Sequence, residues 1–282
     1  IGIEFASFYH SLGVDVTVIE VLPNILPAED DEISALAKQI FEKDGLKVLT
    51  SSRLKSVKKG NGNITAVIEN EDKLIEINTD RMIMAVGIRG NHEHIGLENT
   101  LIKVKKNHVV IDKWCETGEP GIYAIGDLTG PPWLAHKASH EGIICIETIA
   151  GQNEVKPINP LHIPGCTYCH PQIASVGLTE KVAKEEGLDV RIGKFPFKGN
   201  GKAMALGEPE GLIKTIFNAE TGELLGAHML GAEVTELIHG YAIGMSLETT
   251  EVELMETVFP HPTLSEMMHE SVLDAYGKVI HF

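Results

Sequence analysis

Residues 259–266 read F-P-H-P-T-L-S-E, a stretch that places one histidine between two prolines just before a predicted helix. Proline fixes its own φ and restricts the residue before it, so the backbone around His261 is predicted to be extended. Thr263 or Ser265 can cap the helix. Glu266 then lies in the first turn, where the helix dipole favours a carboxylate. We therefore expect the chain to turn back here and bring Glu266 to one nitrogen of His261.

A carboxylate beside an imidazole fixes its tautomer and raises its basicity, which is what a general base needs near neutral pH. His261 and Glu266 are therefore the candidate catalytic residues of this chain. The same letters also fit a surface histidine in a proline-rich turn. The choice between these two interpretations depends on the rest of the sequence.

The whole chain has 282 residues and a formal net charge of −16, and its length suits about two domains. This excess of acidic residues argues against nucleic acids and anionic membranes as partners. The apolar runs are too short to span a bilayer, and no secretory or transit peptide is evident. Four cysteines in a chain of this length do not form the disulfide framework of a secreted protein. We therefore expect a cytoplasmic protein.

The first residues already read as the middle of a helix, because apolar residues recur at helical spacing until Gly13 ends the pattern. A β-branched run over residues 14–20 follows and closes on Glu20. This order is that of the second half of a dinucleotide-binding βαβ unit, in which a glycine permits close packing and an acid takes the ribose hydroxyls. Gly2 and Glu20 fit these two places. The other glycines of that motif would precede residue 1, so we expect a part of a longer protein.

Hydrophobic patterns between this unit and the C-terminus predict an α/β part followed by an α+β part. A helix from Asp30 or Asp31 to Gly45 and a strand over 47–49 precede three antiparallel strands, near residues 54–58, 64–69 and 74–77. Further strands are predicted over 81–86, 109–112 and 121–125, and a helix over 134–150. From residue 157 on, strands are predicted over 173–176, 190–197, 211–217 and 224–230, and helices over 179–186, 234–245, 252–256 and 266–276.

The four cysteines are of two kinds. Cys166 and Cys169 form a C-x-x-C with histidines nearby, a pattern that could bind zinc or act as a redox pair. Only one such motif is present and Pro171 follows it instead of a helix, so we expect two small residues at the entry to a strand. Cys115 and Cys145 read as buried apolar residues. We predict no metal site.

Several segments resemble one known family. Residues 121–127, G-I-Y-A-I-G-D, followed by residues 134–142, L-A-H-K-A-S-H-E-G, resemble the second flavin-contacting segment of the pyridine nucleotide–disulfide oxidoreductases. The H-P-T-L-S-E at residues 261–266 resembles the dimerisation-domain motif of the same family. The resemblance covers essentially the whole chain in order, from the nucleotide half-motif through the flavin segment to the interface domain.

This resemblance implies a partial Rossmann-like NAD domain over residues 1–90, a flavin-contacting segment over 91–156 and an α+β dimerisation domain over 157–282. It also implies FAD and NAD as cofactors and a homodimer as the working form. The implied NAD contacts are Gly2, Glu4, Glu20, Leu54 and Gly87, and the implied FAD contacts are Gly126, Asp127, Trp133, Leu134, Ala135 and His136.

The chain departs from the family pattern in two ways. The A-x-G-R-x-P-N pattern appears as A-V-G-I-R-G-N at residues 85–91, with the arginine displaced and the proline missing. The family's N-terminal flavin fingerprint and its C-x-x-x-x-C redox pair are not in this sequence, and we expect both upstream of Ile1. We therefore expect the 282 residues alone to hold no FAD, to bind NAD weakly or not at all, and to be inactive.

The motif with leucine, H-P-T-L-S-E, is similar to the corresponding motif of the family members that oxidise dihydrolipoamide. This likeness implies that electrons pass from dihydrolipoamide, on the lipoyl domain of a 2-oxoacid dehydrogenase complex, through a redox disulfide and FAD to NAD⁺. His261 would be the base, oriented by Glu266, and would act at the flavin site of the partner subunit. Two alternatives stay open. One is a glutathione-type reductase, which Glu20 disfavours by repelling a 2′-phosphate, and the other is a non-catalytic dimerisation and nucleotide-binding piece.

Overall fold

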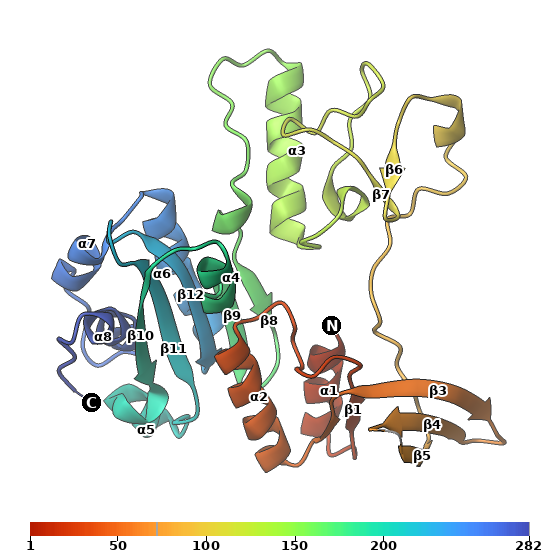
Figure 1. Cartoon of the computed structure of the whole chain (residues 1–282), viewed down its shortest axis with the longest axis horizontal. Coiled ribbons are helices and arrows are strands. Elements are labelled where there is room, and N and C mark those ends of the chain that lie inside the picture. The colour runs from red at the N-terminus through yellow and green to blue at the C-terminus, as the bar shows by residue number, and fades with distance from the viewer. Residues whose placement is uncertain (72, 282) are drawn as a thin grey trace. The chain divides into compact units, whose positions relative to one another are not determined.

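The computed structural model describes residues 1–71 and 73–281 and contains two compact units (Figure 1). The first unit combines residues 1–85 with residues 164–282, and the second spans residues 86–163. The three domains expected from the sequence stay a prediction. The two compact units are defined by contacts within the chain and do not test where those domains begin and end. No helix among the described residues is long and apolar enough to cross a membrane.

The first unit begins with the predicted half of a βαβ unit. Its elements are α1 (Gly2–Ser11), β1 (Thr17–Ile19), α2 (Asp31–Asp44) and β2 (Lys47–Leu49). The two strands pair in parallel, which requires a crossover connection such as α2. Asp30 caps α2 by accepting the N–H of Glu32 at 3.1 Å, and the left-handed Gly45 ends the helix. The predicted helix boundaries are therefore confirmed.

Three antiparallel strands follow, as the sequence predicts: β3 (Ser52–Lys59), β4 (Ile64–Asn70) and β5 (Lys73–Thr79). The central strand β4 buries Ala66 and Ile68 on one face, while the outer strands are largely polar. This alternation is typical of an antiparallel sheet with one solvated face.

The rest of the first unit is an antiparallel sheet in the order β10-β11-β12-β9-β8. Its strands are β8 (Gly165–Thr167), β9 (Gln172–Gly177), β10 (Val190–Pro196), β11 (Leu212–Asn218) and β12 (Leu224–Gly231). Its helices are α4 (Glu180–Glu185), η4 (Phe197–Gly199), α5 (Gly201–Leu206), α6 (Val234–Ser246), α7 (Glu251–Glu256) and α8 (Glu266–Ala275). The predicted α+β pattern is confirmed, and the short β8 and α5 are additional.

The second unit contains little regular structure besides one long helix. Its elements are η1 (Leu97–Asn99), β6 (Val104–Lys105), β7 (His108–Val109), η2 (Gly126–Thr129), α3 (Ala135–Ile149) and η3 (Pro160–His162). The helix predicted over residues 134–150 is confirmed as α3.

Three predicted strands are wrong or much shorter than expected. Residues 81–86 and 121–125 form no strand in the part of the chain that the structure describes, and the strand over 109–112 is reduced to the end of β7. Ile83 and Met84 are exposed instead of buried. A buried strand needs a neighbour on each side, and an apolar run of residues does not supply those neighbours.

Helix α8, which begins at Glu266, packs closely on the sheet. A Cβ at Gly193 of β10 would overlap the carbonyl oxygen of Ser271, so the helix can approach only because this residue has no side chain. Thr215 Oγ1 donates to that carbonyl at 3.2 Å, and the Tyr241 hydroxyl lies 2.9 Å from Ser271 Oγ. These buried contacts from β11 and α6 fix the helix that holds Glu266.

A buried ammonium joins the two halves of the first unit. Lys214 Nζ, in the middle of β11, lies 2.8 Å from Asp30 Oδ1, 2.6 Å from Glu180 Oε2 and 3.1 Å from Glu32 Oε2. The side chains of Lys214 and Asp30 are each only 2% exposed. Asp30 caps α2 and Glu180 begins α4, so one cation connects two helix starts to the sheet.

The cluster keeps its charges despite burial. Burial raises the pKa of Asp30, but the hydrogen bond and charge of Lys214 outweigh it, so the pKa of this carboxyl lies below its ordinary value. For Lys214, burial acts in the opposite direction and lowers the pKa, but its carboxylate partners shift that pKa above the ordinary value. A depressed carboxyl pKa stabilises the fold above the unfolded pKa, and this stabilisation is lost as pH falls through the folded one. The Asp30 contribution is therefore present at neutral pH and lost below roughly pH 4.

Replacing Lys214 by Met should lower the free energy of unfolding by about 3–5 kcal/mol at pH 7, because Asp30 would stay buried without its counter-ion. Urea titration followed by circular dichroism measures this difference, which should shrink as pH falls, because without Lys214 burial raises the pKa of Asp30 and this group becomes neutral in the variant first. Lys194→Met is the matched control. Lys194 Nζ binds Glu32 at 2.8 Å but is 43% exposed, so its loss should cost less than about 1 kcal/mol. Equal losses for the two variants would contradict this account.

Candidate functional site

The predicted contact between His261 and Glu266 is present. His261 Nδ1 lies 2.9 Å from Glu266 Oε1, and Glu266 Oε2 accepts the N–H of Thr263 at 2.9 Å. The predicted cap by Thr263 or Ser265 is wrong, because neither of these described side chains accepts from the first turn of α8. The Thr263 hydroxyl donates to the Pro260 carbonyl at 2.6 Å, and the carboxylate of Glu266 closes the turn instead.

This geometry leaves one nitrogen of His261 available for chemistry. Burial raises the pKa of Glu266, but hydrogen bonds from Thr263 N–H and His261 outweigh it and lower the pKa, so the group is a carboxylate at neutral pH. An anionic acceptor favours the tautomer with the proton on Nδ1. The side chain of His261 is 79% exposed. The arrangement can therefore accept a proton on Nε2 and stabilise the resulting cation.

A second carboxylate–imidazole pair lies one turn further along α8. Glu270 Oε1 is 2.5 Å from His281 Nδ1, and Glu270 Oε2 accepts the N–H of Ile280 at 2.9 Å. Glu270 is buried, so this pair fixes the end of the chain against the helix. This pair is not among the residues predicted from the sequence. The available signal is the spacing of Glu266 and Glu270, because residues four apart share one face of a helix.

The predicted FAD contacts lie in and around η2 and the start of α3. Gly126 is buried with φ at +75°, and the next residue, Asp127, is exposed. Leu134 is the N-cap residue of α3, and its side chain makes no capping hydrogen bond. Ala135 and His136 occupy its first turn. The N-terminus of a helix presents N–H donors and the positive end of the helix dipole to an acceptor group.

Two residues that the sequence analysis does not single out fix this turn. Glu141 Oε2 accepts the N–H of Gly126 at 2.7 Å, and Lys137 Nζ lies 2.7 Å from Glu141 Oε1. Their side chains are only 9% and 10% exposed, respectively. The signal in the sequence is K-x-x-x-E over residues 137–141, a spacing that places both side chains on one face of α3.

Trp133 is oriented by a buried histidine. Trp133 Nε1 donates to His108 Nε2 at 3.2 Å, and His108 Nδ1 lies 2.8 Å from the carbonyl oxygen of Lys106. Because Nε2 accepts from the indole, Nδ1 bears the proton and donates to that carbonyl. No local pattern in the sequence indicates this contact, since residues 108 and 133 lie far apart in the chain.

The predicted NAD contacts are distributed over both units. Glu20 directly follows β1, and its Oε1 accepts the N–H of Leu22 at 2.8 Å. Glu4, on α1, accepts the N–H of Tyr168 at 3.0 Å on its Oε1. The other three are Gly2 at the start of α1, Leu54 on β3 and Gly87 in the second unit.

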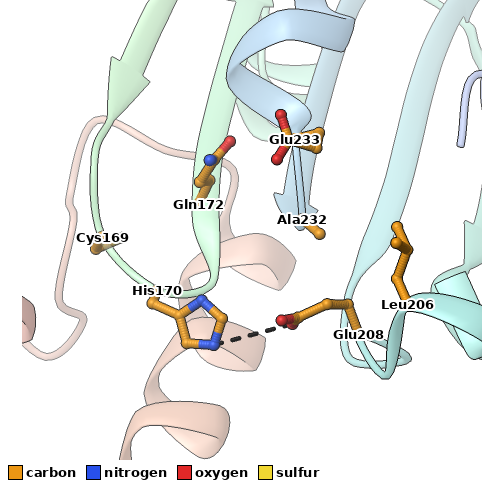
Figure 2. Close-up of a pocket in the computed structure, with 7 residues that line it drawn as sticks. All are labelled: Cys169, His170, Gln172, Leu206, Glu208, Ala232 and Glu233. Atoms are coloured by element: carbon orange, nitrogen blue, oxygen red, sulfur yellow. Dashed lines mark ion pairs between the residues drawn. The ribbon is translucent and has the colours of Figure 1, made fainter. Parts of the chain in front are cut away.

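An open cavity of about 300 Å³ lies in the first unit beside the C-x-x-C segment (Figure 2). It is lined by Cys169, His170, Gln172, Leu206, Glu208, Ala232 and Glu233.

Burial raises the pKa of the Cys169 thiol to about 12, so this thiol stays protonated and is a poor nucleophile. Cys166 lies in β8, as expected for a small strand residue, and Cys115 and Cys145 are buried. Among residues 1–71 and 73–281, no group of three potential ligands could hold a metal ion.

Comparisons with known proteins agree with the order of these elements. Residues 1–142 match the family described as pyridine nucleotide-disulphide oxidoreductase, and residues 163–272 match its dimerisation domain. The dihydrolipoyl dehydrogenase of Rhizobium etli is 60% identical over 99% of this chain and 58% of its own length. That of Zymomonas mobilis is 51% identical over 100% of this chain and 61% of its own length.

A solved structure shares this fold. LpdA from Mycobacterium tuberculosis superposes with a TM-score of 0.87 at 27% identity, over 95% of this chain and 58% of that protein. The chain therefore spans about three fifths of the relatives that it matches. From its family match over residues 1–142 and its dimerisation-domain match over 163–272, this chain belongs to the pyridine nucleotide-disulphide oxidoreductase family.

Proposed function

We propose that the whole protein to which this chain belongs is a dihydrolipoyl dehydrogenase, which oxidises dihydrolipoamide to lipoamide and reduces NAD⁺ to NADH. The observation that carries the proposal is the 2.9 Å contact between His261 Nδ1 and Glu266 Oε1 on an exposed imidazole. Relatives with this name, 60% and 51% identical to the chain, support it. The alternatives remain a glutathione-type reductase and a non-catalytic dimerisation module.

In this proposal, His261 removes a proton from a thiol of dihydrolipoamide. A thiol near its ordinary pKa is mostly protonated at neutral pH, and only the thiolate attacks a disulfide. Nε2 of His261 accepts this proton, while the Glu266 carboxylate stabilises the imidazolium through Nδ1. The S–H bond of the substrate thus breaks and an Nε2–H bond forms on His261, and this chain forms no bond to the substrate sulfur.

The residues of the second unit fit FAD. The exposed Asp127 carboxylate follows a left-handed glycine, an arrangement that suits hydrogen bonds to the ribityl–phosphate region of a flavin. Leu134, Ala135 and His136 would lie by the flavin ring, at a helix start whose N–H donors suit the oxygens of its pyrimidine end. When bound, FAD would supply the two-electron transfer between the enzyme's dithiol and NAD⁺.

The first unit would hold NAD⁺ and provide the dimer contact. Glu20, at the carboxyl end of β1, would accept hydrogen bonds from the ribose hydroxyls, and its charge disfavours the 2′-phosphate of NADP. The dimerisation-domain match over residues 163–272 supports a homodimer. The proposed electron donor is dihydrolipoamide on the lipoyl domain of a 2-oxoacid dehydrogenase complex.

Replacing His261 by Gln in the full-length enzyme should lower the rate of dihydrolipoamide oxidation by roughly 10²–10⁴, because glutamine cannot accept the thiol proton. NADH oxidation by an artificial electron acceptor should change much less, since that reaction takes electrons from the flavin. His10→Gln is the control, because His10 is also paired with a carboxylate, Asp44, at 3.2 Å. Dihydrolipoamide oxidation by the His261 variant within threefold of wild type would refute the assignment.

Replacing Glu266 by Gln should cost less than replacing His261, because the imidazole remains and loses only its anionic partner. The loss should again fall on the dihydrolipoamide half-reaction, which stopped-flow absorbance of the flavin can isolate. If both half-reactions slow equally and the melting temperature falls, Glu266 supports only the fold of the turn.

The 282-residue chain should form a homodimer on its own, since obligate interfaces of this type are usually large and apolar. Light scattering after gel filtration at micromolar concentration should give twice the mass of the chain. A monomer mass under these conditions would count against the proposed assembly.

A further inference from the structure

The turn that holds Asp127 is tied to α3 by a buried carboxylate that the proposed chemistry does not use. The N–H of Gly126 donates to Glu141 Oε2 at 2.7 Å, and Thr129 Oγ1 lies 3.4 Å from Glu141 Oε1. Both oxygens of this one carboxylate therefore face η2. A Cβ on Gly126 would lie 3.4 Å from the Cβ of Ala138, so the turn rests directly on the helix.

Lys137 binds the other end of the same turn. Its Nζ lies 2.7 Å from Glu141 Oε1 and donates to Thr129 Oγ1 at 3.2 Å and to the carbonyl oxygen of Gly130 at 3.3 Å. A lysine ammonium has three N–H donors, so these three contacts use all of them. Glu141 and Lys137 together hold η2 from Gly126 to Gly130.

Stability alone does not explain why charged residues occupy this place. Removing two charges from water is costly, and an apolar pair of similar volume is often equally stable. What the ion pair adds is a defined geometry, because it fixes the direction of the Gly126 N–H. In this arrangement Gly126 is buried and the next residue, Asp127, is exposed. Glu141 and Lys137 are themselves residues of α3, so they hold the turn against the helix whose first turn contains Ala135 and His136.

We propose that Glu141 and Lys137 are positioning residues for FAD: they hold the Asp127 carboxylate and the first turn of α3 in the arrangement that the bound cofactor requires. They act through the turn and not by touching the flavin. The inference rests on the proposed function, since FAD is the ligand assigned there to Asp127. Loss of either side chain should leave α3 folded but let the Asp127 turn move.

The hydrogen bond from the Gly126 N–H to Glu141 can be tested in the 282-residue chain without FAD. In Glu141→Ala, exchange of the Gly126 amide proton, measured by NMR, should be at least tenfold faster than in wild type. Glu141→Gln should stay within threefold, because its amide oxygen can still accept the N–H. Glu147→Ala is the matched control, since Glu147 is an exposed acid of the same helix. Unchanged exchange in Glu141→Ala would overturn the inference at its first step.

The positioning role is tested in the full-length flavoprotein by the dissociation constant of FAD, followed by recovery of flavin fluorescence. Glu141→Ala and Lys137→Met should each raise that constant at least tenfold, and the double variant should add little to either, because the two residues act as one unit. Glu141→Gln should restore most of the affinity. Should Glu141→Ala fail to fold, Lys137→Met and Glu141→Gln still give the comparison.

The other outcomes are also decisive. FAD affinity unchanged in Glu141→Ala, with faster Gly126 exchange, would overturn the positioning role. A fall in melting temperature that tracks FAD loss in all variants, including Glu141→Gln, would reduce the pair to a structural role. If the wild-type flavoprotein itself holds no FAD, the proposed function fails and this role fails with it, whereas the exchange measurement on the tie still stands.

Discussion

The buried ammonium of Lys214 is the contact on which the first unit depends. It joins α2, α4 and β11. Its contact with Asp30 connects residues that lie 184 positions apart in the sequence. The core around it is shared in the same way, because Ile33 of α2 packs in one cluster with Ile173 of β9 and Leu230 of β12. The sheet that supports α8 is therefore anchored to the half βαβ unit. Helix α8, which holds Glu266, packs on that sheet, so the position of the turn containing His261 depends on it.

The same arrangement occurs at four places among the described residues: a carboxylate accepts a backbone N–H and binds one basic side chain. Asp30 pairs with Lys214, Glu141 with Lys137, Glu266 with His261 and Glu270 with His281. A carboxylate has lone pairs enough for both bonds, which offsets the cost of burying it. Exposure separates the two buried lysines from the two histidines, but exposure alone does not identify a chemical role, since the structural His281 is also 65% exposed. Lys214 and Lys137 are 2% and 10% exposed, whereas His261 is 79% exposed and can meet a substrate.

Local signals in the sequence suffice for most of the fold. The cap at Asp30, the left-handed Gly45 and the alternation in β3–β5 each act within a few residues, and each is confirmed. The contact between Glu266 and His261 is predictable for the same reason, since only five residues separate them. Strands predicted over residues 81–86 and 121–125 are wrong, because pairing depends on a neighbour that the run itself does not encode. Lys214 is missed because Asp30 lies 184 residues away, and the contact of Glu141 with Gly126 is missed because it spans 15 residues, although the spacing of Glu141 and Lys137 is local.

The central claim is that Glu266 holds His261 with its proton on Nδ1, so that Nε2 is the acceptor available to a substrate thiol. The most direct measurement is long-range ¹H–¹⁵N NMR on the 282-residue chain labelled with ¹⁵N-histidine, since the nitrogen shifts and couplings identify the tautomer of each imidazole. The account predicts that neutral His261 has its proton on Nδ1, and that Glu266→Gln shifts the population toward the other tautomer. A predominantly Nε2–H imidazole at His261, unaffected by Glu266→Gln, would contradict it.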